Sequence, residues 1–193
     1  MKAVFPDISA AVLAGGKGSR FGGINKSLIR VEGVKIITRT VSLLKPLFHE
    51  IIIAGWPAEE VTPGGTRPIA DNFPGMGPLA GIEAAMKTTD TPFLFVFGGD
   101  MPWLSAEIIV RQAEYFIKET PDVLVPLIGV MTEPLHSIYT CALHSSLEAF
   151  LKKTNNPSVR EFYQLTNVMY FNLPSDEKIL KSFSNINTPT DLL

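Results

Sequence analysis

Cysteine and histidine are scarce in this sequence, and their scarcity limits the chemistry open to it. The single cysteine, Cys141, excludes an internal disulfide bond and suits a reducing compartment. It lies in the apolar run 138–143, so we expect a buried thiol rather than a nucleophile. The three histidines, at positions 49, 136 and 144, lack the spacing of metal ligands, and we expect no zinc site.

Long hydrophobic runs and an excess of charge are missing as well. Runs such as 93–97 are far shorter than the roughly 20 residues that a membrane-spanning helix needs, and no secretory signal is visible. The net charge of −2 gives no indication of a nucleic-acid-binding surface. Hydrophobic residues nevertheless make up 46% of the 193 positions, which is enough for a sizeable core. We expect one cytoplasmic domain over 1–193, with no membrane or nucleic-acid partner.

Continuous apolar strands alternate with amphipathic helices along most of the chain. The apolar pattern predicts strands at 8–14, 51–54, 93–97 and 122–125, and helices at 34–48, 77–87 and 105–118. Such alternation is typical of a mostly parallel sheet that is covered on both faces. The segment 134–143 predicts antiparallel pairing, and 168–173 a later strand. The expected fold class is therefore α/β with a mixed, mostly parallel sheet.

A glycine-rich segment with basic residues follows the first predicted strand. Between Leu13 and Lys26 it holds five glycines and three cations, the latter being Lys17, Arg20 and Lys26. Glycines let backbone amides approach a ligand closely, and amides with fixed cations suit a nucleotide triphosphate. The P-loop pattern fails because Gly18 follows Lys17, and the dinucleotide-binding pattern fails at Phe21.

Two acidic residues follow other strands. Asp100 comes after 93–97 and Asp71 after the short extension 68–70. Ligands of open α/β sheets bind beyond the carboxyl ends of the strands, so we expect the glycine-rich segment and both aspartates to face one cleft. Asp100 can hold Mg²⁺ or cap a turn, and Asp71 can contact a nucleotide or form an Asx-turn.

The basic and amide residues of this cleft have two interpretations each. Lys26 and Arg20 can neutralise phosphate charge or be ordinary surface cations. Asn187 can give a neutral oxygen to the cation or cap a terminal helix. His136 and Ser137 do not suggest a nucleophilic pair, because neighbouring strand residues point to opposite faces.

Together these residues favour nucleotidyl transfer over covalent catalysis. In such a transfer a phosphate of the acceptor attacks the α-phosphorus of the nucleotide, so no protein nucleophile is needed. The protein supplies position and charge stabilisation, and Mg²⁺ offsets the charge that builds on the leaving pyrophosphate.

Several blocks of the sequence resemble the molybdenum cofactor guanylyltransferases. They are 13–16, 20–22 with Lys26, Asp71, 77–81, 100–104 and 185–189, in the order found in that family. The resemblance implies a single three-layer, Rossmann-like nucleotidyltransferase domain. It also implies that GMP passes from GTP to the phosphate of molybdopterin, with Mg²⁺ as cofactor.

The resemblance implies roles for individual residues too. Nucleotide contacts are implied for Leu13, Ala14, Gly15, Gly16, Lys26, Asp71, Gly77, Pro78, Leu79 and Asp100. Catalytic roles are implied for Arg20, Lys26 and Asp100, and metal binding for Asp100 with Asn187. The Gly15-Gly16 pair favours guanine, since cytidylyl relatives tend to read Ala-Ala-Gly there. Asn25 stands where the family usually has Asp, and Phe21 where Met is more frequent.

Two alternatives differ in chemistry from this interpretation. One is a sister transferase that uses CTP or a sugar-phosphate acceptor, and the other is a nucleotide-binding module without catalysis. The favoured hypothesis names GTP and a molybdopterin-type phosphate acceptor as ligands, with transient contact to proteins that handle the cofactor.

Overall fold

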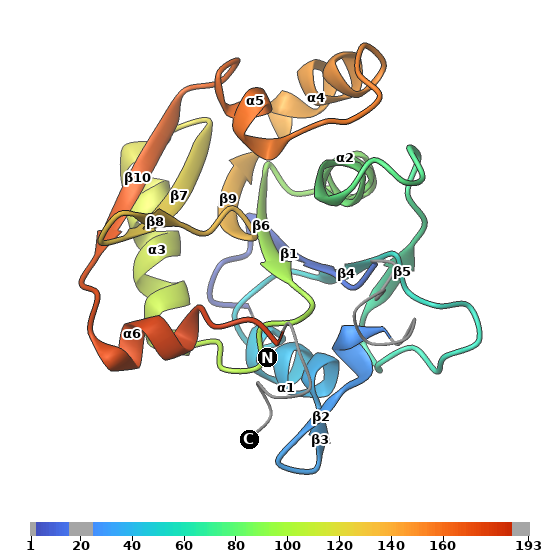
Figure 1. The fold of residues 1–193 in the computed structure, drawn as a ribbon, viewed down its shortest axis with the longest axis vertical. Coiled ribbons are helices and arrows are strands. Elements are labelled where there is room, and N and C mark those ends of the chain that lie inside the picture. The colour runs from blue at the N-terminus through green and yellow to red at the C-terminus, as the bar shows by residue number, and fades with distance from the viewer. Residues whose placement is uncertain (1–2, 16–24, 187–193) are drawn as a thin grey trace.

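The computed structural model of this protein describes residues 3–15 and 25–186. A twisted sheet lies at its centre (Figure 1). Within these residues eight strands form the sheet, with the order β10-β7-β9-β6-β1-β4-β5 and β8 paired to β7 (Figure 1). The strands are β1 (Ile8–Leu13), β4 (Ile51–Ala54), β5 (Arg67–Ile69), β6 (Phe93–Gly98), β7 (Val123–Ile128), β8 (Met131–Thr132), β9 (His136–Thr140) and β10 (Val168–Leu173).

Most neighbouring strands of this sheet are parallel. Strand β1 runs parallel to β4 and β6, β5 runs parallel to β4, and β10 runs parallel to β7. Strand β9 is antiparallel to both β6 and β7, and β8 is antiparallel to β7. The prediction of a mixed, mostly parallel sheet with antiparallel pairing near 134–143 is confirmed.

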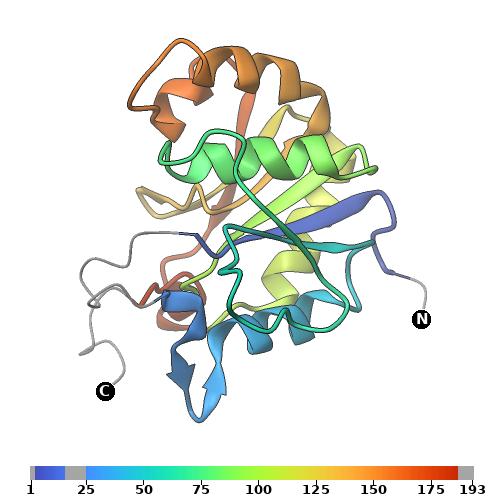
Figure 2. The ribbon, with the colours of Figure 1, turned by 90° about the vertical axis from the view of Figure 1, so that its right-hand side faces the viewer.

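Helices cover both faces of the sheet and give three layers (Figures 1 and 2). One face carries α2 (Pro78–Thr88), α4 (His144–Leu151) and α5 (Val159–Tyr163), and the other carries α1 (Ile36–Leu44), α3 (Ala106–Glu119) and α6 (Glu177–Ser182). Strands β4 and β6 are apolar throughout because alternate side chains enter the two cores. In β6, Phe95 and Phe97 pack towards α1 and α3, while Leu94 and Val96 pack towards α2.

The helix predicted over 34–48 is shorter than expected. It begins at Ile36 because Val34–Lys35 forms strand β3, which pairs with β2 (Arg30–Val31) in a hairpin. Glu32 and Gly33 make its two-residue turn, and both have positive φ, 50° and 79°. The helix ends at Leu44, with Lys45 as its C-cap. Pro46 follows and lacks the N–H that another helical hydrogen bond would need.

Two expectations about single side chains can be compared with the fold. Cys141 does not continue β9 but starts the 3₁₀ helix η3 (Cys141–Leu143), where it is half-buried, and burial raises its pKa to about 12. His136 and Ser137 point to opposite faces, as predicted. Nδ1 of His136 lies 3.0 Å from Gln112 Oε1, whereas the Ser137 hydroxyl donates to the carbonyl of Glu133. Over the described residues, no helix has the length and apolar character that crossing a membrane requires.

Candidate nucleotide-binding site

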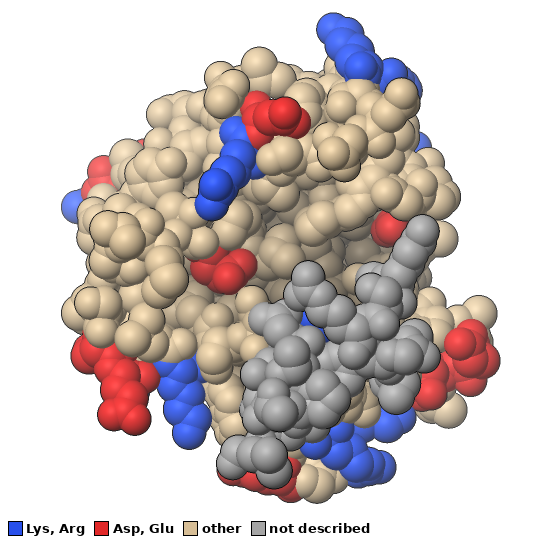
Figure 3. Space-filling model, viewed as in Figure 1, with Lys and Arg blue, Asp and Glu red and all other residues tan. Residues whose placement is uncertain are grey.

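The carboxyl ends of the neighbouring parallel strands β1, β4, β5 and β6 open into one cavity. Its volume is about 690 Å³. Its lining consists of Leu13, Ala14, Gly15, Asn25, Lys26, Ser27, Ala54, Asp71, Gly75, Gly77, Pro78, Gly81, Gly98, Gly99, Asp100 and Leu135. The expectation that the strand-end residues share a cleft is confirmed for the described residues: Leu13–Gly15, Asp71 and Asp100 all line it. In the space-filling view this side is hollowed, and most Lys and Arg lie towards the outline of the molecule (Figure 3).

Lys26 and Asp100 meet in this cavity although 74 positions separate them. Lys26 Nζ donates to Asp100 Oδ2 at 3.0 Å, and each side chain is 24% exposed. Lys26 opens the 3₁₀ helix η2 (Lys26–Leu28), which Asn25 caps. Asn25 Oδ1 accepts hydrogen bonds from Ser27 N and Ser27 Oγ, at 3.0 and 2.7 Å. An aspartate at this position would cap through the same kind of oxygen, so Asn25 preserves the placement of Lys26.

Backbone hydrogen bonds tie the strand ends into a continuous wall of the cavity. The amides of Ala14 and Gly15 both donate to the carbonyl of Ala54, at 2.9 and 3.1 Å, and Gly99 N donates to Leu13 O at 3.0 Å. The amides of Ala14 and Gly15 are therefore already engaged. These two amides are not available to bind phosphate, although the glycine-rich segment led us to expect bare amides. They shape the wall of the cavity instead.

Two glycines make this close approach possible. Gly55 has a φ of +73°, and a Cβ atom added there would lie 2.6 Å from Gly15 Cα. A Cβ atom at Gly99 would lie 2.6 Å from Leu13 O. Both distances are too short for any side chain. The sequence did not predict this role of Gly55, because Gly55 follows β4 and contacts Gly15, which follows β1 and is distant along the chain.

The N-terminus of α2 faces the same cavity. Gly77 is the N-cap of this 11-residue helix, with a φ of 67°, and Pro78 occupies its first turn. Helix N-termini carry partial positive charge and favour anions. Gly77, Pro78 and Gly81 line the cavity, whereas Leu79 is fully buried in the core between α2 and the sheet and does not line it.

Comparison with known proteins shows the family of this chain. The model of the MobA-like NTP transferase domain matches residues 10–168. The chain belongs to this family. A probable molybdenum cofactor guanylyltransferase of Clostridium perfringens strain SM101 is 33% identical over 184 residues, covering 93% of this chain and 91% of the relative. Another such protein, from Carboxydothermus hydrogenoformans, is 34% identical over 188 residues, with 96% and 93% covered.

Solved structures agree with this assignment. Molybdopterin-guanine dinucleotide biosynthesis protein A from Archaeoglobus fulgidus superposes with a TM-score of 0.78 at 27% identity, covering 95% of this chain and 94% of that one. The 2-C-methyl-D-erythritol 4-phosphate cytidylyltransferase of Thermus thermophilus gives a TM-score of 0.70 at 15% identity, over 94% of each chain, which shows a shared fold only. The resemblance to the molybdenum cofactor guanylyltransferases and the nucleotidyltransferase class are thus confirmed.

In this MobA-like domain Asp71 presents an unsatisfied oxygen at the cavity wall. The side chain is half-buried, and Oδ1 is buried without a hydrogen-bond partner in the described part of the chain. Burial raises the pKa of Asp71, and the nearby Glu83 carboxylate raises it further. Buried polar atoms are nearly always hydrogen-bonded, so this oxygen is a natural acceptor for a donor group of a ligand.

Asp100 has neighbours that sequence reasoning missed. The Ile186 amide donates to the Asp100 carbonyl at 2.9 Å, and the Leu135 amide donates to Glu133 Oε1 at 3.0 Å. Burial raises the pKa of Glu133, and the charge of Asp100 adds to the shift. Oδ1 of Asn185 is buried and has no partner within residues 3–15 and 25–186. The contact of Ile186 with Asp100 and the approach of Glu133 to Asp100 have no local sequence signal, because each joins segments that are distant along the chain.

Three predicted site residues, Gly16, Arg20 and Asn187, lie outside the described residues. Among the residues that are described, no three or more His, Cys, Asp or Glu side chains gather where they could share a metal ion.

Proposed function

We propose that this MobA-like domain transfers GMP from GTP to the terminal phosphate of molybdopterin and releases pyrophosphate, with Mg²⁺ as cofactor. The two relatives named above, each a "Probable molybdenum cofactor guanylyltransferase", match almost the whole chain. The observation that carries the proposal is the Lys26–Asp100 pair, a cation and a carboxylate 3.0 Å apart in a glycine-walled cavity. We further propose that the enzyme works in the cytoplasm without nucleic acid or membrane, in transient contact with proteins that handle the cofactor.

The residues at Asp100 fit a magnesium ion. Magnesium prefers hard oxygen ligands and commonly uses one or two carboxylates together with substrate phosphates and water. Asp100 supplies the carboxylate, and we assign the assisting amide oxygen to Asn187 on the resemblance. When bound, Mg²⁺ would neutralise negative charge on the phosphate groups.

The chain itself positions and neutralises the reacting groups. Lys26 places its ammonium beside Asp100, where phosphate charge must be offset, and the N-terminus of α2 adds partial positive charge. Asp71 lines the cavity and offers its carboxylate to an N–H or O–H group of the nucleoside. The acceptor phosphate then attacks the α-phosphorus, and pyrophosphate leaves. Fixed charges of this kind lower the barrier because they need no reorganisation during the reaction.

Product formation tests the proposal directly. The protein is incubated with GTP, Mg²⁺ and molybdopterin, and mass spectrometry follows the guanine dinucleotide form. We expect this product and pyrophosphate from the wild type. A cytosine dinucleotide from CTP, with none from GTP, would overturn the assignment of the base.

Asp100→Asn provides the matched variant for this assay. It keeps the size of the side chain but removes the charge, and we expect turnover to fall about 100-fold or more. Circular dichroism should show an unchanged fold. Normal turnover by a folded Asp100→Asn protein would remove the metal role from Asp100.

A further inference from the structure

Outside the Lys26–Asp100 centre, a fully buried carboxylate links the cavity to a helix of the outer layer. Glu83 lies on α2 with no exposed surface. Its Oε2 accepts a hydrogen bond from Asn72 Nδ2 at 2.9 Å, and its Oε1 lies 2.8 Å from His144 Nε2 on α4. Each carboxylate oxygen therefore has one partner, and the two partners come from separate elements.

Stability alone is a poor explanation of this arrangement. A buried carboxylate loses its hydration, and an apolar residue of similar size often gives equal or greater stability. The neighbours of Glu83 on α2, Ile82 and Ala84, are apolar and buried. An apolar residue at 83 would extend this surface but would leave Asn72 without its partner.

Asn72 is the residue through which Glu83 reaches the nucleotide cavity. It directly follows Asp71, whose Oδ1 is buried at the cavity wall without a partner among the described residues. Gly81 places α2 beside that oxygen, since a Cβ atom at Gly81 would lie 3.7 Å from it, an ordinary van der Waals distance. Fixing the side chain of Asn72 against α2 thus fixes the backbone that carries Asp71.

We propose that Glu83 is a positioning residue for nucleotide binding. Through Asn72 it holds Asp71 so that its carboxylate accepts a hydrogen bond from an N–H or O–H group of the nucleoside, and His144 anchors Glu83 from the other side. This inference rests on the proposed function, since it takes the cavity as the GTP site. The negative charge of Glu83 beside Asp71 also strengthens Asp71 as an acceptor of such donors.

A double-mutant cycle on GTP binding tests the inference without any acceptor. Glu83→Leu removes both hydrogen bonds at similar volume, and isothermal titration should show affinity for GTP about tenfold weaker. Glu83→Gln can still accept from Asn72 and donate to a suitable His144 tautomer, so its affinity should stay within about threefold of wild type. In an Asp71→Ala background, Glu83→Leu should weaken binding by less than about twofold.

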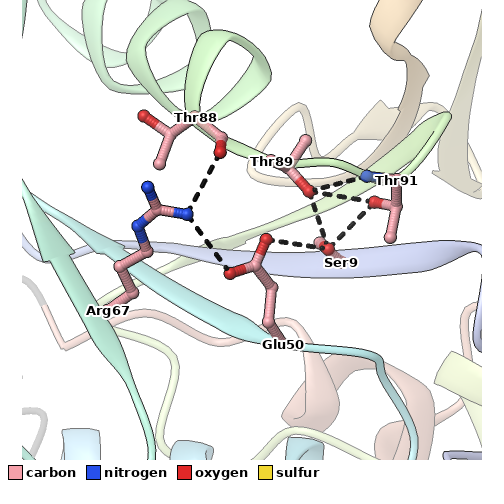
Figure 4. Close-up of polar contacts among 6 residues, drawn as sticks. All are labelled: Ser9, Glu50, Arg67, Thr88, Thr89 and Thr91. Carbon is pink, nitrogen blue, oxygen red and sulfur yellow. Dashed lines mark hydrogen bonds and ion pairs between the residues drawn. The ribbon is translucent and has the colours of Figure 1, made fainter.

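Thr89→Val is the matched control for damage to α2. Thr89 caps the opposite end of this helix, where its hydroxyl donates to Ser9 Oγ at 2.8 Å and accepts from the Thr91 amide (Figure 4). It lies at the amino-terminal edge of β1, away from the cavity-lining residues. We expect a lower melting temperature and unchanged GTP affinity. Equal loss of affinity in Thr89→Val and Glu83→Leu would overturn the inference.

Asn72→Ala keeps the test decisive if Glu83→Leu does not fold. Asn72 is exposed, and its truncation removes only the hydrogen bond to Glu83. Asn72→Ala should therefore weaken GTP binding as much as Glu83→Leu does. In an Asp71→Ala background it should add little further loss of affinity. Additive losses in either cycle would overturn the positioning role. Wild type that binds GTP but makes no dinucleotide would contradict the proposed function alone, whereas wild type without nucleotide affinity would contradict both.

Discussion

At the scale of single residues, polar atoms in and beside the cavity are buried although their burial is unfavourable for stability. Asp71 keeps an acceptor oxygen buried without a partner among the described residues, and Glu83, close to it, keeps a whole carboxylate buried. Lys26 and Asp100, by contrast, form a partly exposed pair. Solvent screening makes such a pair worth little for stability, and under the proposed function its consequence is for ligand binding.

Lys26→Ala should weaken GTP binding about tenfold or more, because an ammonium that contacts phosphate forms a charge-assisted hydrogen bond. Isothermal titration measures this. Lys35→Ala is the control: Lys35 forms a similar pair with Glu60 Oε2 at 3.2 Å but does not line the cavity, and we expect its affinity to match wild type. Equal affinity of the Lys26 variant and wild type would argue against phosphate contact.

Asp71→Asn should raise stability at neutral pH while lowering GTP affinity. The pKa of Asp71 is above its ordinary value of 3.8 in the folded protein, so the native state binds more protons than the unfolded state, and stability falls as pH rises through the folded pKa. The variant avoids this loss. Thermal melts should show the gain at pH 7 and its disappearance as pH falls below 3.8. A gain that is the same at both pH values would exclude charge burial as its cause.

At the scale of elements, the contact between the ends of β1 and β4 sets the distance between these two strand ends in the wall of the cavity. Gly55 follows β4 with positive φ and packs its backbone on Gly15, while Ala14 and Gly15 both donate to Ala54. A larger residue at Gly55 would have to separate the strand ends and so displace the segment that leads to the glycine-rich loop.

Gly55→Ala should therefore destabilise the protein by at least about 2 kcal/mol, since unfavourable φ and a steric clash add. Gly33→Ala isolates the backbone effect. Gly33 has a φ of 79°, but a Cβ atom there meets nothing within 4 Å, so we expect a loss of about 1 kcal/mol. Urea unfolding measures both. Similar losses in the two variants would show that the contact with Gly15 is unimportant.

At the scale of the whole molecule, features with a local sequence pattern could be predicted, whereas contacts between distant segments could not. The apolar runs at 51–54 and 93–97 predicted β4 and β6 closely, because a strand buried on both faces has an unmistakable composition. The rule for strand ends then brought Asp71 and Asp100 to one cavity. The Glu83–Asn72–His144 contacts escaped prediction, since they depend on how α2 and α4 pack.

A buried histidine makes the whole fold sensitive to acid. His136 is enclosed by Phe95, Phe97 and Phe183, and burial lowers its pKa to about 3 from 6.5. Between these values the unfolded state binds a proton that the native state does not, so stability falls as pH falls.

As pH falls through this window, we expect the free energy of unfolding of wild type to decrease by up to about 1.4 kcal/mol more per pH unit than that of His136→Asn. Urea unfolding at several pH values between 6.5 and 3 compares the two slopes, which packing losses in the variant do not affect. Parallel slopes would show that His136 does not control acid sensitivity.

The 3.0 Å contact between Lys26 and Asp100 also bears on the order in which substrates assemble. If Mg²⁺ and GTP bind as proposed, a divalent ion arriving alone would have to displace the ammonium of Lys26 from Asp100, and a nucleotide arriving alone would draw that ammonium away from the carboxylate. When the two arrive together, each half of the pair exchanges one partner for another. Under the proposed function, the pair would therefore favour entry of the metal–nucleotide complex as a unit over entry of either component by itself.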